Sequence, residues 1–197
     1  AQSWITIVDT RALESQTLHL NIAANDTDED REGVITISGE DVAQEIVIKQ
    51  AAFIPKSQIF YTTTNGKIIN VSSSAFDVNI KSNVYENGQG VITFDGVLTK
   101  IGDEAFSEKY TLKSIIIPDG VINLGMSVFY YCSNLESATL PEGLKSLSNG
   151  LFAQCSKLNR VNIPESVVSI GVSAFQGCSN LISITIPKNV TRIPRYA

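Results

Sequence analysis

The sequence predicts a mainly β protein with short helical turns, in which a partial β-sandwich precedes a solenoid with a parallel sheet. Three observations lead to this fold class. Phenylalanine recurs every 23 residues in the second half of the chain, and proline recurs with the same period. Residues 1–50 instead alternate apolar and polar side chains. A fixed period of roughly 20–50 residues is typical of a solenoid, whereas strict alternation indicates strands that bury one face.

The first 52 residues are predicted to form an antiparallel β domain. Its strands are expected at residues 4–8, 17–22, 33–38 and 45–50, because apolar residues alternate there. The acidic run at residues 26–30 could ligate calcium. It lacks the glycine and the distal glutamate of an EF-hand loop, so a solvated connection between strands is the favoured interpretation.

Residues 53–58 are interpreted as a linker, and residues 59–90 as a cap that covers the first coil of the solenoid. Within the cap, Asn65-Gly66 stands between the β-rich runs 59–64 and 67–71. This dipeptide predicts a hairpin, because both central residues of the tightest hairpin turns need positive φ. Residues 90–94 are in phase with the later repeats and are predicted to be the first strand of the stack.

Residues 91–197 contain the repeats, each of which combines a short strand with a tight turn. The spacing of Leu112, Ile115 and Ile117 is that of a strand entering from a turn, and Pro118 ends this strand. One repeat cannot bury its own apolar face, but stacked repeats place equivalent side chains in shared columns. The predicted core columns consist of Phe106, Phe129, Phe152 and Phe175, and of Cys132, Cys155 and Cys178.

The three cysteines are 23 residues apart, so they occupy one repeat position. We therefore expect a column of small buried thiols rather than a metal site, and the odd number argues against a disulfide framework. Residues 189–193 begin a fifth repeat, and residues 194–197 depart from its pattern. The last strand, around Ile184 and Ile186, is predicted to be an exposed edge unless the tail, further chain or another molecule covers it.

The repeat resembles the 23-residue bacterial type of leucine-rich repeat found in BspA-like surface proteins of gut and oral bacteria. The resemblance covers about residues 91–193 and rests on the pattern L-x-x-I-x-I-P…I-G-x-x-A-F-x-x-C-x-x-L. The third copy departs from it at Ser148 and Leu151, where glycine and alanine are usual. This likeness implies a right-handed leucine-rich-repeat solenoid that is extracellular or on the bacterial cell surface, with or without a lipoprotein anchor.

Residues 1–52 resemble the second half of a BACON domain, an immunoglobulin-like module of Bacteroidetes surface proteins. The resemblance rests on S-W-I near the start, on R-E-G ahead of a strand, and on a closing I-x-I-x-Q at residues 46–50. The first strands of that family, expected before Trp4, are absent. The domain is therefore clipped, completed by another segment, or an incomplete sandwich.

Composition and motifs argue against several classes of function. The chain has 15 basic and 20 acidic residues and a net charge of −5, whereas nucleic-acid binding needs clustered Lys and Arg. No apolar run is long enough to span a membrane, and no phosphate-binding loop, metal-ligand motif or cofactor motif occurs. His19, the single histidine, alternates with leucines on a predicted strand. No catalytic residues are expected, and the protein is predicted not to be an enzyme.

The side chains between the buried positions of each repeat strand are predicted to form the concave face of the solenoid. These side chains are Ser114, Ile116, Ser137, Thr139, Arg160, Asn162, Ser183 and Thr185. Because they are mostly small and polar, a binding surface and a plain solvated sheet face are both open interpretations. On the convex side, Tyr130 and Tyr131 are candidates for a contact with a protein.

These features together predict a non-catalytic, exported binding or adhesion protein. Its repeat surface would engage an extracellular protein or glycoprotein partner, and the expected partners are an extracellular protein, mucin or a glycan. Two alternatives stay open: carbohydrate binding through the BACON-like part, and a structural spacer on the cell surface. The prediction depends mainly on the family resemblance, because a fold alone does not define a function.

Overall fold

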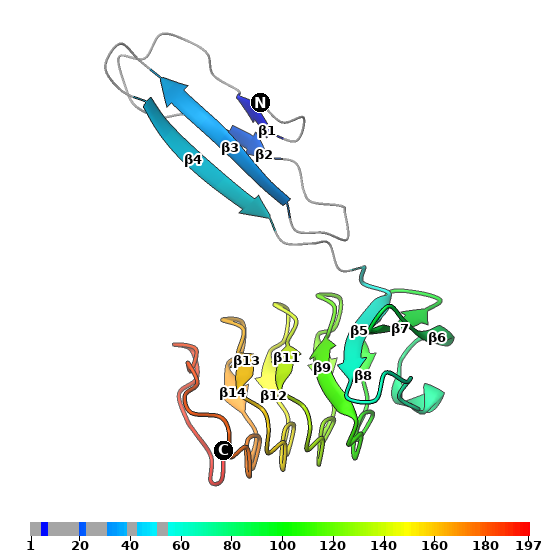
Figure 1. Ribbon diagram of the computed structural model, residues 1–197. Coiled ribbons are helices and arrows are strands. Elements are labelled where there is room, and N and C mark those ends of the chain that lie inside the picture. The colour runs from blue at the N-terminus through cyan, green and yellow to red at the C-terminus, as the bar shows by residue number, and fades with distance from the viewer. Residues whose placement is uncertain (1–4, 8–19, 23–30, 39–42, 51–54) are drawn as a thin grey trace. The chain divides into compact units, whose positions relative to one another are not determined.

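The computed structural model describes residues 5–7, 20–22, 31–38, 43–50 and 55–197. The chain divides into two compact units, Ala1–Ile54 and Pro55–Ala197. In the first unit, β1 (Ile5–Ile7) pairs antiparallel with β2 (Leu20–Ile22), and β3 (Arg31–Ser38) pairs antiparallel with β4 (Ala43–Gln50) (Figure 1). All four predicted strands are therefore present. The acidic run at residues 26–30 and His19 lie outside the described residues.

The second unit is built around a six-stranded sheet in the order β13-β11-β9-β5-β7-β6. Its strands are β5 (Gln58–Thr63), β6 (Ile80–Glu86), β7 (Gln89–Phe94), β9 (Leu112–Ile116), β11 (Ser137–Thr139) and β13 (Arg160–Asn162). The last three pair in parallel, and Ser114, Ser137 and Arg160 are register partners. Each register partner is one repeat further along the chain, as stacking of identical coils requires.

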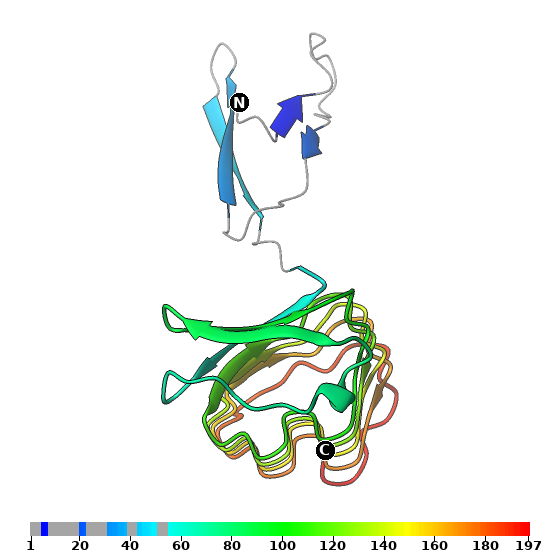
Figure 2. The same ribbon diagram turned by 90° about the vertical axis from the view of Figure 1, so that its right-hand side faces the viewer.

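A second set of parallel pairs closes the other side of each coil. Here β8 (Lys100–Ile101) pairs with β10 (Asn123–Leu124), and β12 (Ser146–Leu147) pairs with β14 (Ser169–Ile170). Figure 2 views the stack from one end, and successive coils nearly superimpose. The fold is thus a mainly β solenoid of leucine-rich-repeat type with a parallel sheet. Within the described ranges, no helix has the length and apolar character needed to cross a bilayer.

The interior of the solenoid is a column of stacked phenylalanine rings. Ring centroids are 5.6 Å apart between Phe106 and Phe129, 5.2 Å between Phe129 and Phe152, and 5.6 Å between Phe152 and Phe175. The first three rings are fully buried, whereas Phe175 in the last coil is partly exposed. At the cap end, Phe76 meets Phe106 edge to face, with the ring planes at 71°. The column therefore joins all coils and the cap into one core.

Backbone hydrogen bonds join the turns of neighbouring coils. In the first coil, the amides of Glu104, Phe106 and Glu108 donate to carbonyls of the second coil at 2.9, 2.9 and 2.7 Å. The same bonds recur one repeat later, and Glu104 and Glu108 both have positive φ. Gly171 marks a close approach, because a Cβ there would lie 2.5 Å from the backbone nitrogen of Asn149. The lack of a side chain at Gly171 therefore permits this close approach between coils, whereas the equivalent position of the third coil accommodates Ser148, whose hydroxyl donates to Leu124 O.

The cap differs from the predicted hairpin. Gly66 has a φ of 66°, but residues 67–71 form no strand. The hairpin in this region is instead β6–β7, with Asn87 and Gly88 at its turn, both at positive φ. The cap also contains the short 3₁₀ helix η1 (Ser73–Ala75). The prediction of a 59–64/67–71 hairpin was therefore wrong, because the partners of β5 come from later in the chain.

The strand β5 also changes the place of β7 in the stack. It lies between β7 and β9 and is antiparallel to both, so β7 is not the direct neighbour of β9. Residues 90–94 were predicted to be the first strand of the stack, but β5 separates this strand from the first repeat strand, β9. The strand β5 fits beside β7 because Gly90 has no side chain and leaves room for the buried ring of Tyr61. A Cβ on Gly90 would lie 2.2 Å from Tyr61 Cζ.

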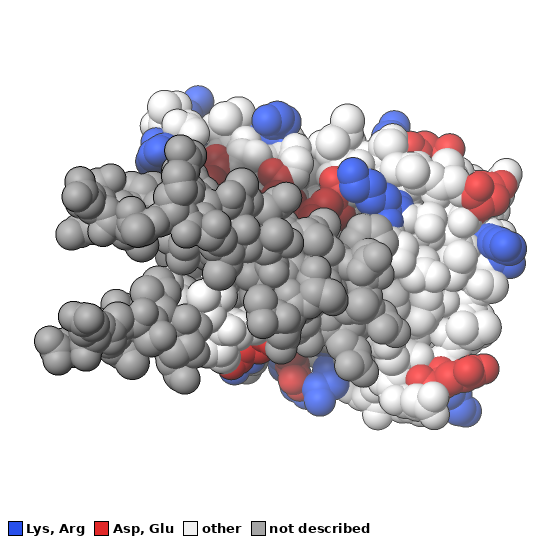
Figure 3. All heavy atoms as spheres, turned by 90° about the horizontal axis from the view of Figure 1, so that it is seen from above, with Lys and Arg blue, Asp and Glu red and all other residues white. Residues whose placement is uncertain are grey.

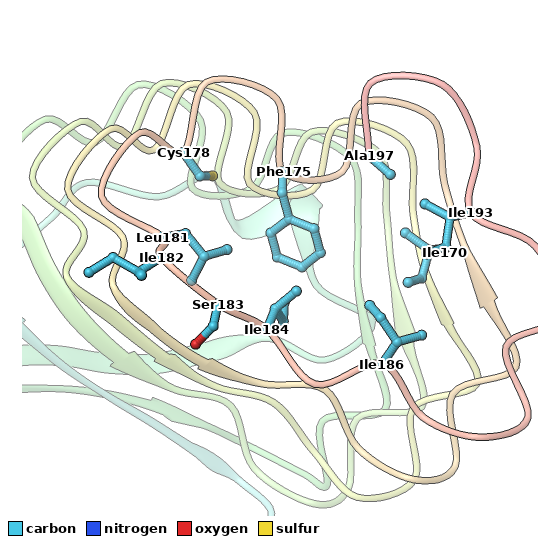
Figure 4. Close-up of a pocket in the computed structure, with 10 residues that line it drawn as sticks. All are labelled: Ile170, Phe175, Cys178, Leu181, Ile182, Ser183, Ile184, Ile186, Ile193 and Ala197. Carbon is cyan, nitrogen blue, oxygen red and sulfur yellow. The ribbon is translucent and has the colours of Figure 1, made fainter.

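The opposite end of the sheet also differs from expectation. Residues 181–186 form no strand, so the sheet ends at β13. The interior of the last coil is open there and encloses about 390 Å³ between apolar side chains. Figure 4 shows Phe175, Ile184 and Ile186 pointing into this space. The predicted exposed edge strand at Ile184 and Ile186 is thus replaced by a loop in which these two side chains still face inward, whereas Ile182 is exposed.

Candidate binding surface

The outer face of the six-stranded sheet is organised in rows that run across the strands. One row joins Phe60, Ile116, Thr139 and Asn162 as successive register partners. The neighbouring row joins Thr62, Ser114, Ser137 and Arg160 in the same way. Strand residues alternate between the two faces, so both rows lie opposite the buried core positions. We call this surface the sheet face.

The character of the sheet face changes from the cap to the last coils. Near the cap, Val84, Val91, Phe60 and Ile116 lie opposite one another on adjacent strands and form an apolar strip. Towards β13 the same row continues with Thr139 and is polar from there on. Thr62 and Ser114 also bond through their hydroxyl oxygens, 2.6 Å apart. The surface therefore offers apolar contacts at one end and hydrogen-bonding groups at the other.

A groove with a volume of about 530 Å³ lies at the polar end of the sheet face. It includes five of the predicted concave-face residues, namely Ser137, Thr139, Arg160, Asn162 and Ser183. Ser114 and Ile116 lie on β9 outside the groove, and Thr185 is exposed in the last coil but does not line it. We call this cavity the sheet groove.

Arg160 is the one basic residue that lines the sheet groove, where it is exposed beside Asn159 and Asn162. Within residues 55–197, Lys113 and Glu136 form an ion pair at 3.9 Å, whereas Arg160 has no ion-pair partner. A guanidinium group can donate two parallel hydrogen bonds to a carboxylate. The groove is thus suited to a ligand that presents an acidic or polar group.

Some residues of this surface were not predicted from the sequence. Phe60 and Thr62 belong to it because β5 pairs with β9, and Glu142 lines the sheet groove. The alternation of Phe60 with the buried Ile59 and Tyr61 was a usable signal, because it already indicated that Phe60 points away from the core. Nothing in the local sequence of residues 58–63 indicated which strand lies beside them.

The aromatic pair predicted on the convex side is exposed. Tyr130 and Tyr131 keep 36% and 41% of their surface, and their rings meet edge to face at 4.7 Å. Tyr131 has a φ of 55°, although a large side chain rarely adopts this conformation. Its amide donates to Ala153 O at 2.9 Å, which helps to hold the turn in place. Both tyrosines are therefore available for a contact on the turn side of the coils.

The cysteines form a buried column in which each thiol has a hydrogen-bond acceptor. The Sγ–H groups of Cys132, Cys155 and Cys178 donate to phenylalanine carbonyls of the preceding coil at 3.0, 3.0 and 3.1 Å. Burial raises the pKa of Cys132 to about 12 and that of Cys178 to about 11, and it also raises the pKa of Cys155. These thiols are therefore protonated at neutral pH and unsuited to nucleophilic chemistry.

Charged residues on the described part of the molecule are interspersed. Figure 3 shows Lys and Arg next to Asp and Glu on one face, with no large area of one sign among the coloured residues. Among the described residues, no group of three His, Cys, Asp or Glu side chains is placed to hold a metal ion.

The stacked coils, the parallel sheet and the exposed sheet face define the class of the protein as a leucine-rich-repeat solenoid. Residues 78–197 match the family model described as "BspA type Leucine rich repeat region", in 6 copies. The chain therefore belongs to the BspA-type leucine-rich repeat family. Residues 1–51 match the BACON model, described as "Putative binding domain, N-terminal". No curated protein matches the chain.

Three solved structures resemble the chain. A leucine-rich repeat protein of T. pallidum is 40% identical over 43% of this chain and 39% of its own, with a TM-score of 0.41. A leucine-rich repeat protein of Bacteroides ovatus is 23% identical and covers 80% of this chain and 35% of its own chain, with a TM-score of 0.48. A leucine rich cell surface protein of Faecalibacterium prausnitzii is 28% identical and covers 71% of this chain and 37% of its own chain, with a TM-score of 0.47. The chain thus spans between 35% and 39% of the length of these proteins.

Proposed function

We propose that the protein is an exported, non-catalytic binding or adhesion protein that holds an extracellular protein or glycoprotein partner on its sheet face. The observation that carries the proposal is the sheet groove, which gathers exposed polar side chains from successive coils around the guanidinium of Arg160. Repeat proteins expose such extended surfaces because each coil adds one strand to a common sheet. The family and the N-terminal BACON domain support a location at the cell surface.

The two ends of the sheet face would act together in such a complex. The apolar strip of Val84, Val91, Phe60 and Ile116 supplies area that a partner can bury. The sheet groove supplies hydrogen-bonding groups and the opposite charges of Arg160 and Glu142, which would define orientation and partner choice. Apolar area flanked by polar groups is the usual composition of a protein interface.

The proposal can be tested by measuring binding of the whole chain to immobilised mucin, enzymatically deglycosylated mucin and collagen. Three proteins are compared: the wild type, Arg160→Glu, and the control Lys145→Glu, which has the same charge change at an exposed position outside the groove. We expect saturable binding of the wild type to at least one probe, at least tenfold weaker binding by Arg160→Glu, and control binding within twofold of the wild type.

Three other results would contradict the proposal, and each would support a different interpretation. Failure of the wild type to bind any of the probes would favour a spacer on the cell surface. Undiminished binding by Arg160→Glu would exclude the sheet groove as the contact surface. Binding that deglycosylation of mucin abolishes, and that residues 1–52 retain when expressed alone, would favour carbohydrate recognition through the BACON domain.

A further inference from the structure

A second groove lies on the turn side of the coils, away from the strands of the sheet face. Its volume is about 430 Å³, and it crosses the first four coils. Exposed apolar and aromatic side chains line much of it: Met126 keeps 51% of its surface, Val172 48% and Tyr130 36%. Asp103 and Glu104 line it at its first coil. We call this cavity the turn groove.

The repeats provide an internal comparison for the turn groove. The position of Glu104 is taken by Ser127, Gly150 and Ser173 in the later coils, and that of Tyr130 by Ser107, Ala153 and Gln176. The position of Asp103 is taken by Asn149 in the third coil. The turn conformation therefore needs neither the two carboxylates nor the aromatic ring, since the other coils form the same turns without them.

The hydrogen bond that Asp103 makes in the turn does not require a negative charge. Its Oδ1 atom accepts the amide hydrogen of Met126 at 2.8 Å, and Asn149 Oδ1 accepts the amide hydrogen of Val172 at the same distance. The side-chain amide oxygen of an asparagine thus accepts this hydrogen bond as well as a carboxylate oxygen does. The negative charge at Asp103 is additional, and it stands beside a second exposed carboxylate at Glu104.

The charge of the turn groove identifies the kind of partner that fits it. None of its lining residues is Lys, Arg or His, while two are acidic. A cation placed between a tyrosine face and carboxylates gains both cation–π and ionic attraction. Apolar side chains beside such a site can cover aliphatic neighbours of the cationic residue. This combination differs from the sheet groove, which is lined by one basic residue, Arg160, and one acidic residue, Glu142.

We propose that the turn groove binds an extended peptide segment of a protein partner that presents an arginine between aliphatic residues. The guanidinium would lie against Tyr130 and pair with Asp103 and Glu104, and the aliphatic side chains would cover Met126 and Val172. The proposal does not depend on binding at the sheet face, because the two grooves share no residue.

The test is an NMR titration of the ¹⁵N-labelled whole chain with two matched peptides, acetyl-Leu-Arg-Val-Leu-amide and acetyl-Leu-Glu-Val-Leu-amide. We expect the arginine peptide to shift the amide signals of the turn groove saturably, with a Kd of about 1 mM or tighter. The glutamate peptide should leave these signals unchanged. Absence of a saturable shift with the arginine peptide, or equal shifts with both peptides, would overturn the proposal.

Two variants copy residues that the repeat already uses, so they keep the turn intact. The double variant Asp103→Asn/Glu104→Ser should weaken binding of the arginine peptide at least fivefold, and Tyr130→Ala at least twofold. Glu142→Gln removes an exposed carboxylate that lines the sheet groove and should leave the affinity unchanged, as should Arg160→Glu. Unchanged affinity in the double variant, or equal loss in Glu142→Gln, would contradict the assignment.

Discussion

At the scale of single residues, three of the stacked phenylalanines, Phe106, Phe129 and Phe152, are among the largest fully buried side chains. Phe152 is fully buried and has a ring on each side at 5.2 and 5.6 Å. We expect Phe152→Ala to lower the free energy of unfolding by about 3–5 kcal/mol, because it leaves a cavity that neither neighbour can fill. Urea denaturation followed by circular dichroism measures this loss.

The control for this experiment is Phe175→Ala, since that ring is already partly exposed at the last coil. Its removal should cost clearly less than removal of Phe152. Equal losses at the two positions would show that the column does not act as a continuous core.

The buried thiols predict a loss of stability in alkali. The pKa values of Cys132 and Cys178 are raised by burial to about 12 and about 11, whereas an unfolded thiol titrates near 9. Above this pH the unfolded chain loses protons that the folded chain keeps, so deprotonation favours unfolding. The thiol contribution is thus fully present below about pH 9 and declines as the pH rises through the folded values.

Unfolding free energies measured between pH 8 and 11 for the wild type and for Cys132→Ala/Cys178→Ala test this expectation. The slope of stability against pH should be less steep in the variant. A second readout is alkylation of the native protein by iodoacetamide, where Cys178 should react first, because it keeps 9% exposure and the other two thiols none. Reaction of Cys155 ahead of Cys178 would contradict the picture.

The repeat period made these residues predictable, and its limits explain what was missed. Equivalent positions 23 residues apart face the same environment, so the columns of Phe129 and Cys155 follow from counting. Glu142 lines the sheet groove from the loop after β11, and its repeat position, which holds Asp119 and Glu165 in the neighbouring coils, gives no sign of this contact. The turn groove was missed because the sequence does not show that Asp103, Glu104 and Tyr130 line one cavity.

At the scale of elements, β5 holds the cap to the first coil. Its buried side chains alternate with outward ones, and Tyr61 reaches across Gly90 to donate a hydrogen bond to Asn83 Oδ1 at 2.7 Å. We expect Gly90→Ala to lower the free energy of unfolding by about 1–3 kcal/mol, since the new methyl group overlaps the Tyr61 ring. Thermal unfolding of the two proteins, with Gly96→Ala as the control at a site with more room, provides the measurement.

If Gly90→Ala were as stable as the wild type, the ring of Tyr61 could not lie where β5 places it. This contact also explains why the cap was only partly predictable. Asn65-Gly66 is a strong local hairpin signal, but the partners of β5 lie about 30 and 50 residues later, at β7 and β9. Pairing over such distances depends on side-chain fit across strands, which propensity does not report.

At the scale of the whole molecule, the two units should unfold independently. The main hydrophobic cluster of the described residues runs from Ile59 to Cys178 and contains no described residue of the first unit. We expect residues 55–197 expressed alone to show the same urea midpoint as the corresponding transition of the full chain. A large decrease would show that the first unit contributes to the stability of the solenoid.

The fold class followed from the sequence because period and alternation are global features, and the antiparallel pairs β1–β2 and β3–β4 agree with it. The last coil was less predictable. Ile184 and Ile186 keep their inward direction, but residues 181–186 make no strand pairing with β13. The spacing of apolar residues predicts which side of the chain is buried, but it does not predict whether the backbone amides form hydrogen bonds with a neighbouring strand.

Because β5 is antiparallel to β9, the stack of repeats can be lengthened by gene duplication only on the side of the parallel strands β9, β11 and β13. A coil has matching front and back surfaces, so copying one 23-residue unit among β9, β11 and β13 would add about 4.8 Å of sheet without any new packing problem. On the other side, the reversed strand offers no such surface. Evolution can therefore adjust the reach of this molecule in fixed increments, while the cap stays unchanged.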